Sequence, residues 1–199
     1  MLKKFLLICA PVISLIVLAV GTPKIEGHSL SPVLCIGDST LYACDGTVVS
    51  RKGFPEQLAQ FSKRTVINDG ICGGTTFQVL LNLEARHGNA HYAAIVIRVG
   101  LNDLRFNAWS PDMYRKLLRQ ANKRADKVIV VAWECANGEM GATNVAIEKI
   151  AREESCLYVV PHLSGSDFNG DAIHPNIQGS RKIADAVWHE LSSRDPEIP

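Results

Sequence analysis

The sequence has no excess of charge of either sign, since 21 Lys and Arg residues stand against 20 Asp and Glu residues, for a formal net charge of +1. Both a nucleic-acid interface and an anionic-surface binder require clustered basic residues, and here they are spread along the chain. The sequence therefore predicts no nucleic-acid partner. Histidine is also scarce, at six of 199 residues. No Cys/His pairs stand at zinc-ligand spacing, so no metal site is expected.

Long apolar runs are missing except near the N-terminus, where residues 5–20 follow the basic pair Lys3 and Lys4. This run has the length of a signal-peptide core and is short for a membrane span, which needs ~20 apolar residues. Residues 1–21 are therefore interpreted as a cleaved signal peptide or, alternatively, as an uncleaved membrane anchor. Either interpretation predicts an exported protein, periplasmic or extracellular. It would meet a membrane only if the leader were retained as an anchor.

The length suits one domain, which can bury a full core without a metal or a disulfide framework. Residues 22–32 are rich in Gly, Pro, Ser and Thr and are interpreted as a linker. Residues 33–193 are expected to form the globular domain, and residues 194–199 a short C-terminal tail. Cys35 and Cys156 lie in apolar segments, where we expect small buried hydrophobic side chains rather than reactive thiols.

Short apolar runs alternate with longer amphipathic ones along the predicted domain. The short runs are rich in Val and Ile and apolar on both faces, as buried parallel strands are. They are residues 33–36, 65–67, 93–99, 127–132 and 157–160. The predicted helices are residues 55–63, 76–86, 111–125, 143–154 and 176–192. This alternation predicts an α/β fold, a three-layer α/β/α sandwich with a five-stranded parallel sheet, and places reactive residues after the strands.

A serine follows the first predicted strand directly, in the segment Gly37-Asp38-Ser39-Thr40. At a strand-to-helix turn a serine hydroxyl is presented at the lip of the sheet. The backbone N–H of that serine then points into the same cleft from a helix start. An isolated Gly-Asp-Ser is equally compatible with a plain N-cap serine, so this segment alone does not establish a nucleophile.

Two further segments follow the second and third predicted strands. Residues 68–76 form a glycine-rich loop that can expose backbone N–H groups to an anion, and no Lys follows it as in a phosphate-binding P-loop. Gly100-Leu101-Asn102-Asp103 follows the third strand. The Asn102 amide can donate to an oxyanion, although Asn-Asp is also a common turn pair.

An acid and a base precede the last predicted helix, in Asp171-Ala172-Ile173-His174-Pro175. On one turn, the Asp171 carboxylate can accept from His174 Nδ1, which leaves Nε2 free to take a proton from a hydroxyl. A solvated Asp and a chance His are the alternative, but their order and placement weigh against it. The remaining histidines are expected in surface or capping roles. They are His28, His87, His91, His162 and His189.

Together the four segments resemble the SGNH hydrolases, also called the GDSL lipase/esterase family, over residues 33–191. The resemblance implies a flavodoxin-like fold of the SGNH type and a triad of Ser39, Asp171 and His174. It also implies an oxyanion hole made by the N–H groups of Ser39 and Gly73 and the Asn102 amide. Gly73 is preferred to Gly70 as the oxyanion glycine, although Gly74 stands where the family often has an acidic or polar residue.

The resemblance implies an exported serine esterase that forms an acyl-enzyme on Ser39 and needs no metal or organic cofactor. The expected partner is a small-molecule ester or thioester with a short or medium acyl group. An acyltransferase or a carbohydrate deacetylase would use the same residues, and a non-catalytic binding module is the least favoured alternative. Phe106 and Trp109 are expected to border the cleft and bind substrate, or else to pack under their loop. Arg98, a charge within an apolar strand, is expected to pair with a carboxylate.

Overall fold

The computed structural model describes residues 31–42, 52–136, 138 and 140–193. The predicted leader and tail, and most of the predicted linker, lie outside these residues, as do His28 and Cys44. Within the described ranges, no helix has both the length and the apolar character that crossing a membrane requires.

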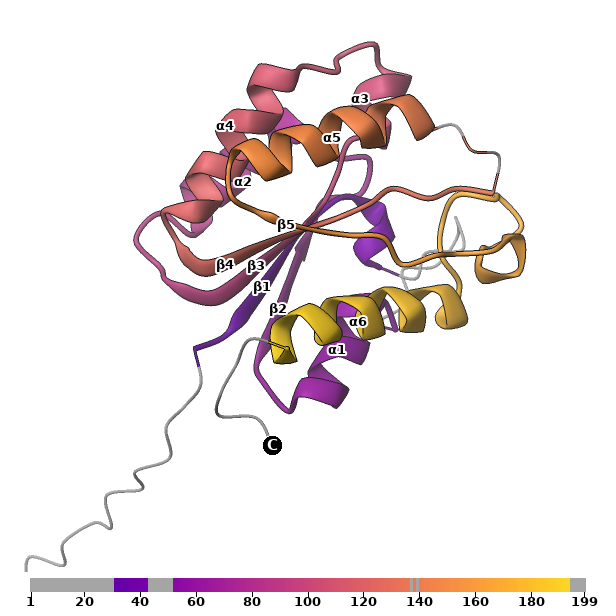
Figure 1. Ribbon diagram of the computed structural model, residues 1–199, viewed down its shortest axis with the longest axis horizontal. Coiled ribbons are helices and arrows are strands. Elements are labelled where there is room, and N and C mark those ends of the chain that lie inside the picture. The colour runs from indigo at the N-terminus through magenta and orange to yellow at the C-terminus, as the bar shows by residue number, and fades with distance from the viewer. Residues whose placement is uncertain (1–30, 43–51, 137, 139, 194–199) are drawn as a thin grey trace, which may run out of the picture.

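Five parallel strands form one sheet in the order β2-β1-β3-β4-β5 (Figure 1). Their bounds are Val33–Gly37 (β1), Val66–Gly70 (β2), Tyr92–Arg98 (β3), Ala125–Val131 (β4) and Leu157–Val159 (β5). Because β1 pairs with both β2 and β3, the strand order reverses beside it. Ligands of open α/β sheets bind outside the carboxyl ends of the strands at such a switch point.

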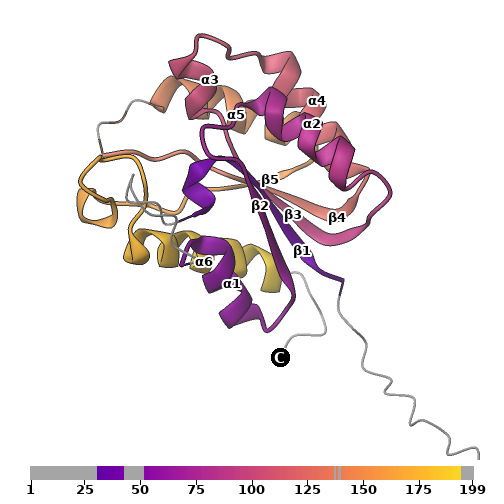
Figure 2. The same ribbon diagram turned by 180° about the vertical axis from the view of Figure 1, so that it is seen from behind.

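Helices cover both faces of this sheet. Three of them, α2 (Thr76–Arg86), α4 (Pro111–Asn122) and α5 (Gly141–Glu153), lie on one face. The opposite face carries α1 (Phe54–Ser62) and α6 (Ile177–Ser192), as Figures 1 and 2 show from the two sides. Three shorter helices stand in connecting segments: η1 (Ser39–Leu41), α3 (Leu101–Arg105) and η2 (Gly165–Asp167).

The alternation of strand residues divides the core into two layers. In β1, Leu34 and Ile36 pack in the layer with α2, α4 and α5, whereas Val33 and Cys35 pack in the layer with α1 and α6. Both faces of the strand are therefore apolar, as expected for a parallel sheet covered on both sides. Cys35 and Cys156 are buried and free, which confirms their prediction as small core side chains.

The fold class, the five strands and the five long helices confirm the sequence predictions, although most element boundaries differ from the predicted ones by one to three residues. β2 continues to Gly70 instead of ending at residue 67, because its whole length pairs with β1. Helix α4, which was predicted to reach residue 125, ends at Asn122, because Ala125 already pairs with Tyr92 of β3. The short helix α3 forms where the sequence suggested only a turn.

Candidate active site

The turn that carries Ser39 is set by the two residues before it. At Gly37 a Cβ atom would lie 2.0 Å from the backbone oxygen of Arg98, so only glycine lets β1 end this close to β3. Asp38 is the N-cap of η1, and its Oδ1 accepts from Thr40 N at 3.0 Å and from Thr40 Oγ1 at 2.9 Å. These contacts hold Ser39 at the carboxyl edge of the sheet.

His174 brings its ring to this serine from the segment before α6. Ser39 Oγ and His174 Nε2 lie 2.8 Å apart, and His174 Nδ1 lies 2.5 Å from Asp171 Oδ2. The second oxygen of the same carboxylate accepts from the backbone N–H groups of Ile173 and His174, each at 2.9 Å. The hydroxyl, imidazole and carboxylate therefore form a continuous hydrogen-bonded chain, the geometry in which an imidazole can take a proton from a hydroxyl.

Partial burial of Asp171 raises the pKa of its carboxyl group. The hydrogen bonds from the His174 ring and from the two backbone N–H groups outweigh this effect and leave the pKa below its usual value. The carboxylate is thus ionised at neutral pH and fixes the His174 ring by accepting from Nδ1.

The turn from Asn169 to His174 is itself closed by backbone hydrogen bonds. Asn169 N donates to His174 O at 2.8 Å, and Ala172 N donates to Asn169 O at 2.9 Å. Ala172 O in turn accepts from Ala136 N at 3.1 Å, which ties the turn to the segment after β4. These backbone bonds therefore fix the turn from which the His174 ring projects.

Three groups that could donate to an oxyanion come from three other segments. Among the described residues, neither Ser39 N–H nor Gly73 N–H has a hydrogen-bond acceptor. Gly73 adopts a positive φ of 70°, a conformation that side chains disfavour. Asn102 Nδ2 donates to Gly74 O at 3.0 Å, which fixes the amide and leaves its second N–H for a ligand. Gly70, the glycine that was not chosen for the oxyanion hole, is the last residue of β2 and so belongs to the sheet.

Asp103 connects the Asn102 segment to the start of α2. Its carboxylate oxygens accept from Thr76 N at 3.1 and 2.9 Å, and the side chain is buried. Burial raises the pKa of the Asp103 carboxyl, whereas the bonds from Thr76 lower it, with burial the larger effect. The hydrogen bonds between Thr76 and Asp103 fix the loop that contains Gly73 relative to α3.

The two aromatic residues expected at the cleft have different surroundings. Phe106 is 65% exposed, whereas Trp109 packs against the core and on Tyr114, with ring centroids 5.5 Å apart. Phe106 is therefore accessible to a ligand, and Trp109 packs under its loop.

His87 has the second of the two roles predicted for it, since it is a capping residue and not a surface one. It is the C-cap of α2, as such a role implies, but its ring is buried between two other elements. His87 Nε2 lies 2.8 Å from Asp69 Oδ2, and Nδ1 lies 2.6 Å from Tyr92 Oη. The acid comes from β2 and the phenol from β3, so local spacing around His87 gives no sign of them.

Arg98 differs from its prediction. The guanidinium is fully buried, yet within the described part of the chain it forms no ion pair with a carboxylate. Its partners are instead Thr40 Oγ1 and the backbone oxygen of Ala132, both at 3.2 Å. The prediction of a direct carboxylate pair is therefore wrong, because a hydroxyl stands between Arg98 and Asp38.

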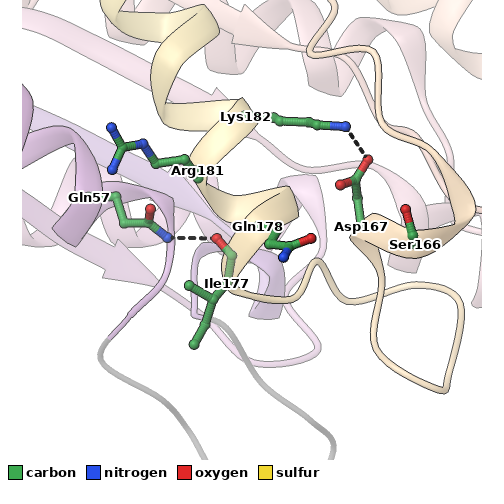
Figure 3. Close-up of a pocket in the computed structure, with 7 residues that line it drawn as sticks. All are labelled: Gln57, Ser166, Asp167, Ile177, Gln178, Arg181 and Lys182. Carbon is green, nitrogen blue, oxygen red and sulfur yellow. Dashed lines mark hydrogen bonds and ion pairs between the residues drawn. The ribbon is translucent and has the colours of Figure 1, made fainter.

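A cavity of about 490 Å³ is lined by seven residues, all of them labelled in Figure 3. Neither Ser39 nor His174 lines it. Its walls come from α1, η2 and the first turns of α6, and its lining residues are Gln57, Ser166, Asp167, Ile177, Gln178, Arg181 and Lys182. Within the described ranges, no group of three His, Cys, Asp or Glu residues is placed to hold a metal ion.

The chain is similar in fold to several solved structures. With the W215I form of Axe2, an acetyl xylan esterase from Geobacillus stearothermophilus, it has a TM-score of 0.69 and 17% identity, covering 84% of this chain and 97% of that one. With LAE5, an alpha/beta hydrolase enzyme from the metagenome of Lake Arreo in Spain, it has a TM-score of 0.66 and 18% identity, covering 83% of this chain and 96% of that one. With TesA it has a TM-score of 0.66 and 20% identity, covering 81% of this chain and 98% of that one. No curated protein sequence matches the chain.

The fold and the hydroxyl–imidazole–carboxylate chain at its carboxyl edge define a serine hydrolase that acts on ester bonds. The sequence model of the GDSL-like lipase/acylhydrolase family matches residues 35–182, and the chain belongs to this family. The matched range contains every segment described at the site, from the end of β1 to the second turn of α6.

Proposed function

We propose that the protein is an exported serine esterase that hydrolyses carboxylic esters or thioesters of short or medium acyl groups, with Ser39 as nucleophile. The observation that carries this proposal is the 2.8 Å contact between Ser39 Oγ and His174 Nε2, with His174 Nδ1 held by Asp171 at 2.5 Å. A binding protein has no need of a hydroxyl aligned on an oriented imidazole.

In the proposed reaction Ser39 Oγ attacks the ester carbonyl carbon while its proton passes to His174 Nε2. Asp171 stabilises the imidazolium that forms. The N–H groups of Ser39, Gly73 and Asn102 would meet the negative carbonyl oxygen, and losing one such donor typically costs ~3 kcal/mol. His174 then gives its proton to the leaving oxygen or sulfur, which leaves an acyl group on Ser39.

Water completes the cycle by the same steps. His174 takes a proton from the water molecule, the hydroxide attacks the acyl carbonyl, and the proton returns to Ser39 Oγ as the C–O bond breaks. Apart from the ester and the water molecule, the groups that act in these steps belong to the chain itself.

A fluorophosphonate probe tests the role of Ser39 directly. We expect one covalent adduct, located at Ser39 by peptide mass analysis, on the folded protein and none on the Ser39→Ala variant. The same variant should lose turnover of p-nitrophenyl butyrate while its melting temperature stays within about 2 °C of the parent. A folded parent protein that gives no adduct would instead favour the non-catalytic binding module.

The acyl specificity is tested with p-nitrophenyl esters from acetate to laurate. We expect the highest kcat/KM for short or medium chains, and a maximum at the longest chain would contradict this part of the proposal. Repeating the assay with an added alcohol separates hydrolysis from acyl transfer. Ester formation that replaces release of the free acid would favour the acyltransferase.

A carbohydrate ester is the second candidate substrate, and the cavity in Figure 3 is the observation that favours it. Ile177, its exposed apolar residue, follows His174 by three positions in the sequence, so one wall of the cavity belongs to the segment that carries the proposed base. The Gln178 amide, the Arg181 guanidinium and the amide oxygen of Gln57 would form the hydrogen bonds that sugar hydroxyls need. The amide nitrogen of Gln57 already donates to Lys52 O and Ile177 O, each at 3.1 Å. Axe2, the similar fold described above, is an acetyl xylan esterase.

Acetylated xylo-oligosaccharides distinguish the two candidates. If the cavity binds the sugar, Gln178→Ala should raise KM for the oligosaccharide about fivefold and leave KM for p-nitrophenyl acetate unchanged. Equal KM values for parent and variant on both substrates would exclude this use of the cavity.

The proposed export rests on the sequence of residues 1–21 alone. Cell fractionation and N-terminal sequencing of the protein made from its full sequence test it. A cleaved product in the extracellular or periplasmic fraction is expected. An uncleaved product in the membrane fraction would favour the anchor, and a cytoplasmic product would contradict export.

A further inference from the structure

Arg98 is a fully buried charge at the carboxyl end of β3, one strand away from the nucleophile turn. Its Nε donates to Thr40 Oγ1 and its Nη1 donates to Ala132 O, each at 3.2 Å. The guanidinium carbon lies 4.8 Å from the centroid of the Trp133 ring. Burial of a charge is costly unless specific partners compensate it, and apolar residues would fill this position at lower cost.

The contacts of Arg98 lead to the residues on either side of Ser39. Thr40 Oγ1 accepts from Arg98 Nε and donates to Asp38 Oδ1, so one hydroxyl bridges the guanidinium and the carboxylate. The backbone adds a second link, since Asp38 N donates to Arg98 O at 3.2 Å. Asp38, Thr40 and Arg98 are all fully buried, which keeps water from replacing these bonds.

The charge of Arg98 acts on Asp38 in a defined direction. Burial raises the pKa of Asp38 to about 6, and the two bonds from Thr40, the charge of Arg98 and that of His174 all act to lower it. The ionised carboxylate accepts hydrogen bonds only, as its N-cap role requires. Arg98 and Thr40 therefore favour the form of Asp38 that holds the η1 turn.

The ionisable groups near Arg98 all act to raise its pKa, against the effect of burial. Burial lowers its pKa to about 10, and the charges of Asp38, Glu134 and Cys135 act to raise it. Arg98 thus stays a cation near neutral pH, with Nε directed at Thr40 and Nη1 at Ala132, while Nη2 has no hydrogen-bond partner among the described residues.

We infer that Arg98 is a positioning residue for Ser39, which it holds in line with His174 by way of the Thr40 hydroxyl and the Asp38 cap. This inference rests on the proposed role of Ser39 as nucleophile. Thr40 and Asp38 flank Ser39 directly, so movement of either changes the 2.8 Å contact of Ser39 Oγ with His174 Nε2. A misplacement of ~1 Å at a reacting group can cost on the order of 100-fold in rate.

Thr40→Val tests the bridge with little change in volume. We expect kcat for p-nitrophenyl acetate, and the rate of fluorophosphonate labelling, to fall roughly tenfold or more, with KM within about twofold of the parent. Ser180→Ala is the matched control, because the fully buried Ser180 hydroxyl has no hydrogen-bond partner among the described residues. Both rates should stay at the parent level in this control.

Arg98→Met, alone and combined with Thr40→Val, shows whether the guanidinium acts through the hydroxyl. We expect Arg98→Met to lower kcat like Thr40→Val, and the double variant to lose little more than either single variant. Multiplicative losses in kcat would overturn the inference. If Arg98→Met does not fold, a parent-like labelling rate in Thr40→Val overturns it, and a tenfold loss supports it.

Labelling of the parent protein distinguishes failure of the positioning role from failure of the proposed esterase function. Labelling of parent Ser39 with an unchanged rate in Thr40→Val defeats the positioning role alone. Absence of labelling in the parent defeats the esterase proposal and the positioning role with it.

Discussion

Asp171 holds His174 at two points, because one carboxylate oxygen lies 2.5 Å from the ring Nδ1 and the other accepts from the His174 backbone N–H at 2.9 Å. A single side chain therefore fixes both the ring and the turn from which the ring projects. Ala172, one of the two residues between them in this turn, has a positive φ of 61°, a conformation that is uncommon for residues other than glycine.

Asp171→Asn should lower kcat by roughly a thousandfold or more with little change in the melting temperature. The amide can donate to Nδ1 and so favours the tautomer with its proton on Nε2, which cannot accept from Ser39. The test is kcat for p-nitrophenyl butyrate at pH 7.5. Asp126→Asn is the control, since Asp126 contacts His91 at 2.8 Å on the exposed surface. A kcat within fivefold of the parent in Asp171→Asn would remove Asp171 from the triad.

Asn102→Ala should lower kcat about 100-fold, equivalent to ~3 kcal/mol, and leave KM within about threefold. An oxyanion donor acts on charge that develops only after binding, so its loss appears in kcat. Steady-state kinetics on p-nitrophenyl acetate separate the two constants. Asn122→Ala removes a comparable amide from the exposed face of α4, where its Nδ2 donates to Glu154 O, and should leave both constants unchanged. A loss confined to KM would show that Asn102 binds substrate instead.

The stability of the fold should fall as pH rises through about 6, relative to that of Asp38→Asn. Burial raises the folded-state pKa of Asp38 to about 6 from its ordinary value of 3.8, so the folded protein binds this proton more tightly than the unfolded chain. The stabilisation is fully present below pH 4 and is lost as pH rises through 6. Two pKa units correspond to on the order of 3 kcal/mol. Urea unfolding from pH 4 to 8 measures the difference, and parallel pH curves for parent and variant would contradict the predicted pKa shift.

Gly37→Ala should prevent stable folding or lower the free energy of unfolding by several kcal/mol. The added Cβ would lie 2.0 Å from Arg98 O and 2.6 Å from Leu41 Cδ1, so β1 and β3 would have to separate. Gly165→Ala is the matched change, because no atom lies within 4 Å of the Cβ that it adds. Thermal melts of the two variants make the comparison. Equal melting temperatures would show that the strands adapt without cost.

The sheet was predictable because its information is local. β1, β3 and β4 contain short runs of Val, Ile and other apolar residues that are buried on both faces, whereas β2 is Val-Ile followed by Asn-Asp-Gly. The Pro111 start of α4 was likewise visible, since Ser110 caps it by accepting from Met113 N at 3.2 Å. The end of α4 was not, because pairing of Ala125 in β4 decides it.

The site was predictable in part for a related reason. Ser39, Asn102 and His174 each follow a strand or precede the last helix, and the parallel topology brings such positions to one edge. The partners of Arg98 lie in η1 and directly after β4, and the acid partner of His87 lies in β2, so no local pattern gives them. The sequence therefore suggested a carboxylate for Arg98, where the structure has a hydroxyl, a carbonyl and an aromatic ring.

Ser39 and His174 are separated by 135 positions, and α6, which follows His174, packs against α1 in the same core layer. During synthesis the hydroxyl therefore emerges long before the imidazole that would activate it. A ribosome-bound chain that ends after β5 contains all five strands of the sheet but not the base. The proposed chemistry begins only when the segment through α6 has left the ribosome and docked, so the order of synthesis keeps the nascent polypeptide inert.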